Sequence, residues 1–298
     1  MKAIVTGGAG FIGSHIAKRL LKDGHKVVIF DDLSAGKLEN LPDKAKFVQV
    51  DVSNWDELGA NKEYFDGCDV IFHNAASKKN ICLRDPVRDL HVNGGGTLML
   101  LQLAKEYKVK KFVHASTGSV YGTVIGTITE ETPLNPVSYY GISKLAGESY
   151  VRHFGYAYDM NVTILRYFHV YGNGQENDPA LGGVVAIFKN QIESSRAIMI
   201  HGSGEQERVF THVDDIVEAN IQSWKQSRAY CKTYNCASDE KTTVGELADI
   251  LMDNYGVVET EYTDPLPGDI FWFDVDATRI KELGVNFRGF RHGIKTML

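Results

Sequence analysis

Hydrophobic residues along the chain occur in two patterns, short runs rich in β-branched residues and longer stretches with an apolar residue every three or four positions. The short runs predict strands, which in the N-terminal half cover residues 2–6, 26–31, 47–51, 70–73, 112–116 and 162–168. The longer stretches predict helices at residues 11–22, 86–107 and 139–158. Because strands that alternate with helices imply βαβ units, we expect a doubly wound, mainly parallel sheet with helices on both faces.

The pattern changes in the C-terminal half, where residues 172–183 are rich in Gly, Asn and Asp and predict a loop. Further elements follow as helices at residues 184–194, 213–226 and 244–255 and a short strand at residues 198–200. We therefore expect an α/β protein with two lobes. The first is a Rossmann-type domain of residues 1–170, to which residues 208–238 return. The second is a smaller α/β lobe formed by residues 171–207 and 239–298.

Composition narrows the possible partners. The chain has 298 residues, a formal net charge of −6 and an isoelectric point near 5.9. Nucleic acids and anionic membranes attract positive charge, so we expect neither as a partner. No apolar run approaches the roughly 20 residues of a membrane span, and the N-terminal run is too short for a signal peptide. The four cysteines lack C-x-x-C or zinc-ligand spacing, so we expect reduced cysteines, no metal and a cytoplasmic location.

A glycine-rich turn, residues 6–13 (TGGAGFIG), connects the first expected strand to the first expected helix. Gly7, Gly10 and Gly13 have the spacing that lets backbone N–H groups approach a pyrophosphate at the positive end of a helix. The alternative is a packing turn without a ligand. The position between a strand and a helix favours a dinucleotide site.

The second expected strand ends in Asp31, whose carboxylate can accept hydrogen bonds from the ribose hydroxyls of adenosine. The same charge would repel the extra phosphate of NADP, and no arginine follows Asp31 closely in the sequence. We therefore predict NAD as the cofactor. Two alternatives stay open. Lys37 could favour NADP, and Asp31 could be an ordinary acidic residue at the end of a strand.

Tyr140 and Lys144 are four residues apart at the start of an expected helix, so both project from one helical face toward one substrate oxygen. A tyrosine has a pKa near 10, and a nearby ammonium or a positive nicotinamide ring would lower it. A reduction of about 3 units corresponds to about 4 kcal/mol. Ser116 and Thr117 end the preceding strand, where a hydroxyl could hold the reacting oxygen or only bond the local backbone.

Together these motifs resemble those of the extended short-chain dehydrogenase/reductases, in the nucleotide-sugar epimerase/dehydratase group. The resemblance extends over nearly the whole chain. Further matching stretches are Asp51-Val52, residues 73–76 (HNAA), 116–122 (STGSVYG), 131–133 (ETP), 165–168 (LRYF), 212–215 (HVDD), 267–269 (PGD) and 283–284 (LG).

The resemblance implies a catalytic set of Thr117, Tyr140 and Lys144. Tyr140 would exchange the proton of a sugar 4-hydroxyl, Thr117 would bond that hydroxyl, and Lys144 would bind the nicotinamide ribose. The implied contacts to NAD are Gly7, Gly10, Phe11, Ile12, Gly13, Asp31, Asp32, Ser34, Gly36, Asp51, Val52, Ala75, Ala76, Lys78, Asn93, Tyr140, Lys144 and Phe168. The implied substrate contacts are Lys78, Thr117, Tyr140, His169 and Arg208.

Two positions after Thr117 bear on the reaction. Dehydratases of the group carry Asp-Glu there, and decarboxylases carry Glu one residue further on, whereas this chain has Gly118 and Ser119. The resemblance therefore favours epimerisation of a nucleotide-diphosphate sugar at C4, most simply a UDP-sugar. A ketoreductase, an atypical dehydratase and a non-catalytic NAD-binding regulatory protein are the alternatives.

Other positions depart from the group. His169 replaces the usual Asn, and Leu266 stands where a diphosphate-binding Arg is common, while Arg208 matches the second such Arg. Helices 97–107 and 139–153 resemble the pair that forms a homodimer interface in the group. Apolar residues on them either face a partner or pack on the chain's own sheet: Leu98, Leu101, Ala146 and Val151.

Overall fold

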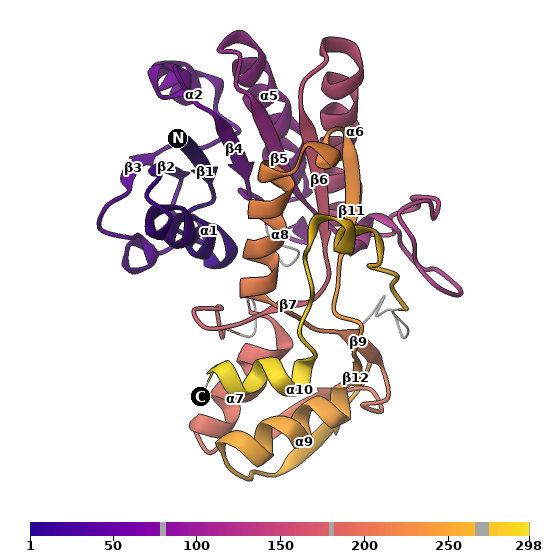
Figure 1. Cartoon of the computed structure of the whole chain (residues 1–298). Helices are drawn as coiled ribbons and strands as arrows, with labels where there is room; N and C mark the ends of the chain where they lie inside the picture. Colours follow the sequence, from indigo (N-terminus) through magenta and orange to yellow (C-terminus); the bar gives the residue numbers. More distant parts are fainter. Residues whose placement is uncertain (78–81, 179–181, 266–273, 298) are drawn as a thin grey trace.

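The computed structural model describes residues 1–77, 82–178, 182–265 and 274–297 of the chain (Figure 1). At its centre is a seven-stranded parallel sheet in the order β3-β2-β1-β4-β5-β6-β11. Its strands are β1 (Lys2–Thr6), β2 (Lys26–Asp31), β3 (Lys46–Gln49), β4 (Val70–His73), β5 (Lys111–Thr117), β6 (Val162–Tyr167) and β11 (Lys232–Cys236). The strand order changes direction between β1 and β4, and ligands of such sheets bind at the carboxyl ends of the strands at this point. The expected doubly wound α/β fold is confirmed.

Helices cover both faces of the sheet. They are α1 (Phe11–Lys22), α2 (Trp55–Ala60), α4 (Pro86–Leu90), α5 (Thr97–Glu106), α6 (Tyr139–Tyr158) and α8 (Val213–Lys225). The side chains of a strand alternate between faces, so Ala3 and Val5 of β1 join one core with α1 and α8, while Ile4 joins a second core with α5 and α6. Both faces of β1 are therefore fully buried, as expected for a central parallel strand.

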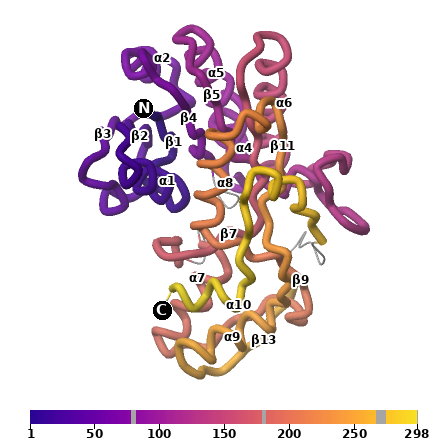
Figure 2. The backbone as a smooth tube through the Cα atoms, viewed as in Figure 1, coloured from indigo at the N-terminus to yellow at the C-terminus, as the bar shows by residue number. Residues whose placement is uncertain are grey.

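A second lobe lies beyond the carboxyl ends of the central strands (Figure 1). The described residues of this lobe form three small strand pairs, one helix pair and a short C-terminal helix. The elements are β7 (Val170–Tyr171) with β10 (Thr211–His212), β8 (Ile198–His201) with β13 (Thr260–Thr263), β9 (Glu207–Val209) with β12 (Lys241–Thr243), α7 (Val184–Glu193) with α9 (Val244–Tyr255), and α10 (Phe290–Gly293). The backbone trace shows that the N-terminus lies at the central sheet and the C-terminus in this second lobe (Figure 2).

The single helix expected at residues 86–107 is wrong in detail, because a π-helical segment, His91–Gly96, separates α4 from α5. Directly after it, the hydroxyl of Thr97 donates to the Asn93 carbonyl at 2.6 Å and so competes with the regular helical ladder. A Cβ at Gly96 would lie 3.0 Å from Val52 Cγ2, so this segment passes close to the end of β3. The irregular turn places Asn93 and α4 beside the carboxyl ends of the strands.

Candidate active site

The glycine turn between β1 and α1 adopts a conformation that side chains could not follow. Gly7 has φ +68°, and a Cβ there would lie 2.7 Å from the Ala75 backbone nitrogen. A Cβ at Gly13 would lie 2.2 Å from the Gly7 carbonyl oxygen. No described side chain caps α1, and its first turn carries no acidic residue. The positive end of α1 is thus left available to an anion such as a pyrophosphate.

Asp31 lies at the carboxyl end of β2, beside this turn. Its two carboxylate oxygens accept the backbone N–H groups of Ala9 and Leu33, both at 2.9 Å. Burial raises the pKa of Asp31, and these two hydrogen bonds oppose that effect. The carboxylate is therefore held in one orientation with further acceptor capacity for ribose hydroxyls.

A cavity of about 720 Å³ runs along the carboxyl ends of the strands, within the size range of cofactor sites. Residues expected to contact NAD form most of its lining: Gly7, Gly10, Phe11, Ile12, Gly13, Asp31, Asp32, Ser34, Gly36, Asp51, Val52, Ala75, Ala76, Tyr140 and Lys144. Asn93 lies behind this lining, where its amide accepts the Ser77 N–H and donates to the Ser143 hydroxyl. Lys78 lies outside the described residues.

The start of α6 brings Tyr140 and Lys144 to this cavity. Ser138 caps the helix by accepting the Gly141 N–H at 3.1 Å. A Cβ at Gly141 would lie 2.6 Å from the Ser119 carbonyl oxygen, so the start of α6 is packed directly against the segment that follows β5. The Lys144 ammonium is buried and donates to the Ala115 carbonyl at 2.6 Å. The pair is therefore fixed at the end of β5.

The electrostatics of Tyr140 differ from the expectation. Burial raises the pKa of Tyr140 to about 12, and the charge of Asp89 adds to that increase while a hydrogen bond with Thr117 opposes it. Burial also lowers the pKa of Lys144 to about 8, against the opposing charges of Glu148 and Asp89. In the chain by itself, desolvation of the phenol outweighs the stabilisation that the protein supplies. The expected decrease in the pKa of Tyr140 also relied on a positive nicotinamide ring, so for the NAD-bound site it stays a prediction.

The segment after Thr117 is tightly packed. Gly118 is buried, and a Cβ there would lie 2.3 Å from Cε1 of Phe168. The Phe168 ring is itself buried and stacks on Tyr121 with a centroid distance of 6.3 Å. Phe168 therefore fills the space next to position 118, where a carboxylate side chain would have to lie.

Two of the expected substrate contacts lie further along the chain, outside the lining of the cavity. His169 follows β6 with φ +36°, and its ring packs edge-on against Phe210 at 6.0 Å. Arg208 lies on β9 opposite Thr242 of β12, and its guanidinium donates to the Glu207 carbonyl at 2.8 Å. Leu266 lies outside the described residues. The roles of His169 and Arg208 therefore stay predictions.

A family model described as the NAD dependent epimerase/dehydratase family matches residues 3–237. The chain belongs to this family. UDP-glucose 4-epimerase of Mycolicibacterium smegmatis is 38% identical over 295 residues, which cover 95% of this chain and 92% of that protein. The crystal structure of the Thermotoga maritima UDP-glucose 4-epimerase with UDP-glucose is 35% identical and has a TM-score of 0.94, covering 100% of this chain and 97% of that one.

NAD is the cofactor of the family, and a UDP-glucose 4-epimerase from Thermus thermophilus has been solved with NAD, at 32% identity and a TM-score of 0.92 over 100% of this chain and 97% of that one. The residues of this chain fit that cofactor. The glycine turn leaves room for a pyrophosphate where Cβ atoms would clash, Asp31 offers acceptors to the adenosine ribose, and Lys144 lies at the other end of the same cavity.

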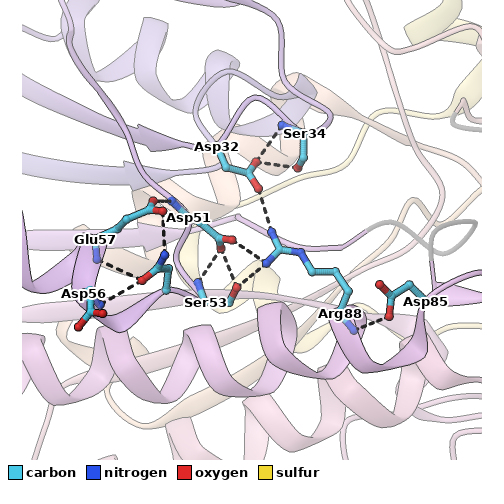
Figure 3. A network of polar contacts seen from close by, with 9 residues as sticks. Asp32, Ser34, Asp51, Ser53, Asp56, Glu57, Asp85 and Arg88 are labelled. Carbon is cyan, nitrogen blue, oxygen red and sulfur yellow. Dashed lines mark hydrogen bonds and ion pairs between the residues drawn. The ribbon is translucent and has the colours of Figure 1, made fainter.

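The sequence alone did not reveal one charged residue of this cavity. Arg88 of α4 reaches the carboxyl ends of β2 and β3, where it pairs with Asp32 at 3.0 Å and with Asp51 at 2.6 Å (Figure 3). It lies 56 residues from Asp32 in the sequence. No local sequence pattern connects Arg88 with these two acids. Asp32 and Asp51 each stand in an Asp-x-Ser sequence, which is typical of a turn but does not identify the arginine.

The expected interface residues divide into two groups. Leu101 and Val151 are fully buried in the core beneath α5 and α6, so of the two alternatives these residues pack on the chain's own sheet. Leu98 and Ala146 are half-buried. Large apolar side chains are instead exposed on α4 and α6: Val87, Leu90, Tyr139, Ile142 and Tyr150.

The described residues show neither a metal-binding cluster nor a membrane-spanning helix. They contain no cluster of three His, Cys, Asp or Glu side chains that could hold a metal ion. None of their helices combines the length and the apolar character that crossing a bilayer requires. His212 instead caps α8, because its Nδ1 accepts the Asp214 N–H at 3.2 Å.

Proposed function

We propose that this protein is an NAD-dependent nucleotide-sugar 4-epimerase. The observation that carries the proposal is the arrangement of Tyr140, Lys144 and Thr117 at the end of β5, next to a packed Gly118–Phe168 contact. The family includes dehydratases as well as epimerases, so membership alone does not decide the reaction.

The packing at Gly118 argues against elimination of water. A dehydratase of this group needs a carboxylic acid directly after Thr117 to protonate the leaving hydroxyl. In this chain any side chain at position 118 would collide with the buried ring of Phe168. An acid–base pair without a second acid is sufficient for epimerisation, because that reaction only removes and restores the same proton and hydride.

Each residue of the site then has a defined task. Tyr140 takes the proton of the 4-hydroxyl and returns it after the 4-keto sugar has turned over. The Thr117 hydroxyl shares a hydrogen bond with Tyr140 and can bond the same substrate oxygen. Lys144, one helical turn further along α6, is proposed to bind the nicotinamide ribose. Bound NAD supplies a hydride acceptor that becomes the hydride donor in the second half of the reaction.

We propose a UDP-sugar as the substrate, because relatives over nearly the full length bear the name UDP-glucose 4-epimerase. Arg208 is proposed to hold its diphosphate and His169 to contact it, since guanidinium pairs well with phosphate. Lys78 and Phe168 complete the proposed contacts to substrate and cofactor. In the proposed two-lobe division, residues 1–170 with 208–238 form one lobe and residues 171–207 with 239–298 form the other, so Arg208 is the first residue of the segment that returns to the first lobe.

We further propose a homodimer formed through the exposed apolar side chains of α4 and α6, which pack against each other within the chain. Val87 and Ile142 are each more than half exposed, and burying such residues is favourable. A cytoplasmic location agrees with the four cysteines, none of which forms a disulfide within the described residues.

A panel of nucleotide sugars incubated with the NAD-loaded protein tests the reaction. We expect interconversion of a pair of C4 epimers, detected by anion-exchange chromatography, with neither net NADH consumption nor loss of mass. Net consumption of NADH would instead identify a ketoreductase, and a product lighter by one water would identify a dehydratase. Bound NAD without turnover of any sugar would support a regulatory protein and overturn the proposal.

A further inference from the structure

Arg88 occupies an unusual position in the cofactor cavity. One guanidinium nitrogen donates to Asp51 and to the Ser53 hydroxyl, both at 2.6 Å, and a second donates to Asp32 at 3.0 Å (Figure 3). The side chain is one-third exposed and lines the same cavity as the glycine turn. A fully ionised guanidinium therefore faces the adenosine end of the site.

The two carboxylates that hold Arg88 are arranged alike. Asp32 uses one oxygen to accept the N–H and hydroxyl of Ser34, at 2.9 and 2.6 Å, and its other oxygen pairs with Arg88. Asp51 repeats this arrangement with the N–H and hydroxyl of Ser53, at 2.8 and 2.7 Å. Each carboxylate is thus oriented by its own turn toward the guanidinium between them.

This arrangement bears on the choice between NAD and NADP. An arginine near the end of β2 ordinarily accommodates the 2′-phosphate of NADP. The sequence around Asp31 contains no such arginine, but the fold supplies one from α4. We propose that Arg88 forms a latent 2′-phosphate site, and that Asp32 and Asp51 exclude NADP by occupying its guanidinium.

The balance of charge supports this proposal. The four groups Asp31, Asp32, Asp51 and Arg88 together carry a net charge of −2, and Glu39 adds a further negative charge to the lining of the same cavity. A 2′-phosphate would bring about −1.5 to −2 more charge, and it would have to displace existing ion pairs to reach Arg88. The nearby Lys37 does not offset this charge, because its ammonium pairs with Glu176 at 3.0 Å.

Removing one of the two carboxylates should expose the latent site. Asp32→Asn keeps the side-chain shape and an acceptor for Ser34 but removes the charge opposite Arg88. The freed guanidinium can then form the paired hydrogen bonds that suit phosphate. A charge-assisted hydrogen bond is strong enough to change affinity by about tenfold or more.

The experiment compares bound nucleotides in the full-length protein. Wild type, Asp32→Asn, Arg88→Gln and the double variant are each equilibrated with equal concentrations of NAD and NADP. They are then desalted, and the nucleotides released on denaturation are quantified by chromatography. Glu39→Gln serves as the matched control, since Glu39 lines the same cavity while the ion pairs of Arg88 are with Asp32 and Asp51. Because the readout is nucleotide content, the result is independent of whether the protein is an epimerase.

We expect Asp32→Asn to raise the NADP-to-NAD ratio by at least about tenfold, and Glu39→Gln to change it by less than about threefold. The double variant should return to within about threefold of the wild-type ratio, because the increase depends on Arg88. An unchanged ratio in Asp32→Asn, or an equal increase in the double variant, would overturn the proposal. If circular dichroism shows that Asp32→Asn is not folded, the same measurement is made on Asp51→Asn and on the Asp51→Asn, Arg88→Gln double variant. The same changes in the NADP-to-NAD ratio then support or overturn the proposal.

Discussion

Glu148 is a fully buried carboxylate one helical turn after Lys144, and we expect its replacement by Gln to lower the thermal stability of the protein. It accepts the Ser116 hydroxyl at 2.6 Å and two bonds from Arg166, at 2.9 and 2.8 Å. Arg166 is 1% exposed, so Glu148→Gln would leave its charge buried without a counter-ion. Breaking one side of such a pair costs about 3–5 kcal/mol. For a chain of this length that corresponds to a decrease in Tm of about 5–8 °C.

Differential scanning fluorimetry of the NAD-saturated protein measures this decrease. Arg152→Gln is the matched control, since Arg152 bonds the same carboxylate from a side chain that is 42% exposed, and such a pair contributes at most about 1 kcal/mol. A Glu148→Gln protein with a Tm within about 2 °C of the wild type would refute the reasoning.

The difference in Tm between the wild type and Glu148→Gln should also depend on pH. Burial alone would raise the pKa of Glu148, but the hydrogen bonds and charge of Arg166 hold that pKa below its usual range. A carboxylate with a lowered folded-state pKa stabilises the protein above its unfolded pKa, and the contribution is lost as pH falls through the folded value. The difference in Tm between wild type and Glu148→Gln should therefore be constant between about pH 6 and 8.

Four further predictions concern the site. Tyr140→Phe should lower turnover by at least about 100-fold while NAD remains bound; near-normal turnover in steady-state assays would exclude Tyr140 as the acid–base group. Besides burial, the charge of Asp89 raises the pKa of Tyr140, so in Asp89→Asn the rise of turnover with pH should move to lower pH. A profile that stays in place or moves to higher pH would contradict that coupling. Asp31→Ala should weaken NAD binding by about tenfold or more, measured by calorimetry, because a charged acceptor is lost; unchanged affinity would remove Asp31 from the site. Arg208→Ala should raise KM for the nucleotide sugar much more than it changes NAD affinity, and an unaltered KM would show that the diphosphate is held elsewhere.

The sequence predicted those parts of the fold that depend on neighbouring residues. The first strand, the glycine turn and α1 are adjacent in the chain, and their hydrophobic periodicity and turn chemistry are local properties. The same holds for the start of α6, where Ser138 caps a helix whose first turn carries Tyr140. The parallel sheet followed from the alternation of such elements, and its presence is confirmed.

The remaining features depend on contacts between distant segments. Arg88 meets Asp32 across a sequence separation of 56 residues, because the fold brings α4 beside the carboxyl ends of β2 and β3. Leu101 and Val151 are buried because the rotation of α5 and α6 on the sheet turns these two positions toward the core. Helical periodicity defines an apolar face without stating which neighbour covers it.

The pKa of Tyr140 could not be predicted from the sequence, because it depends on how deeply the fold buries the phenol. Burial raises the pKa of Tyr140 to about 12 and lowers that of Lys144 to about 8. Both shifts favour the neutral forms, because desolvation acts against any charge. A phenolate near neutral pH therefore needs additional positive charge or hydrogen-bond donors in the cavity, and an oxidised nicotinamide ring carries such a charge. In the folded chain alone the phenol form of Tyr140 is favoured over the phenolate, so the proposed role of Tyr140 predicts that proton removal requires a bound cofactor.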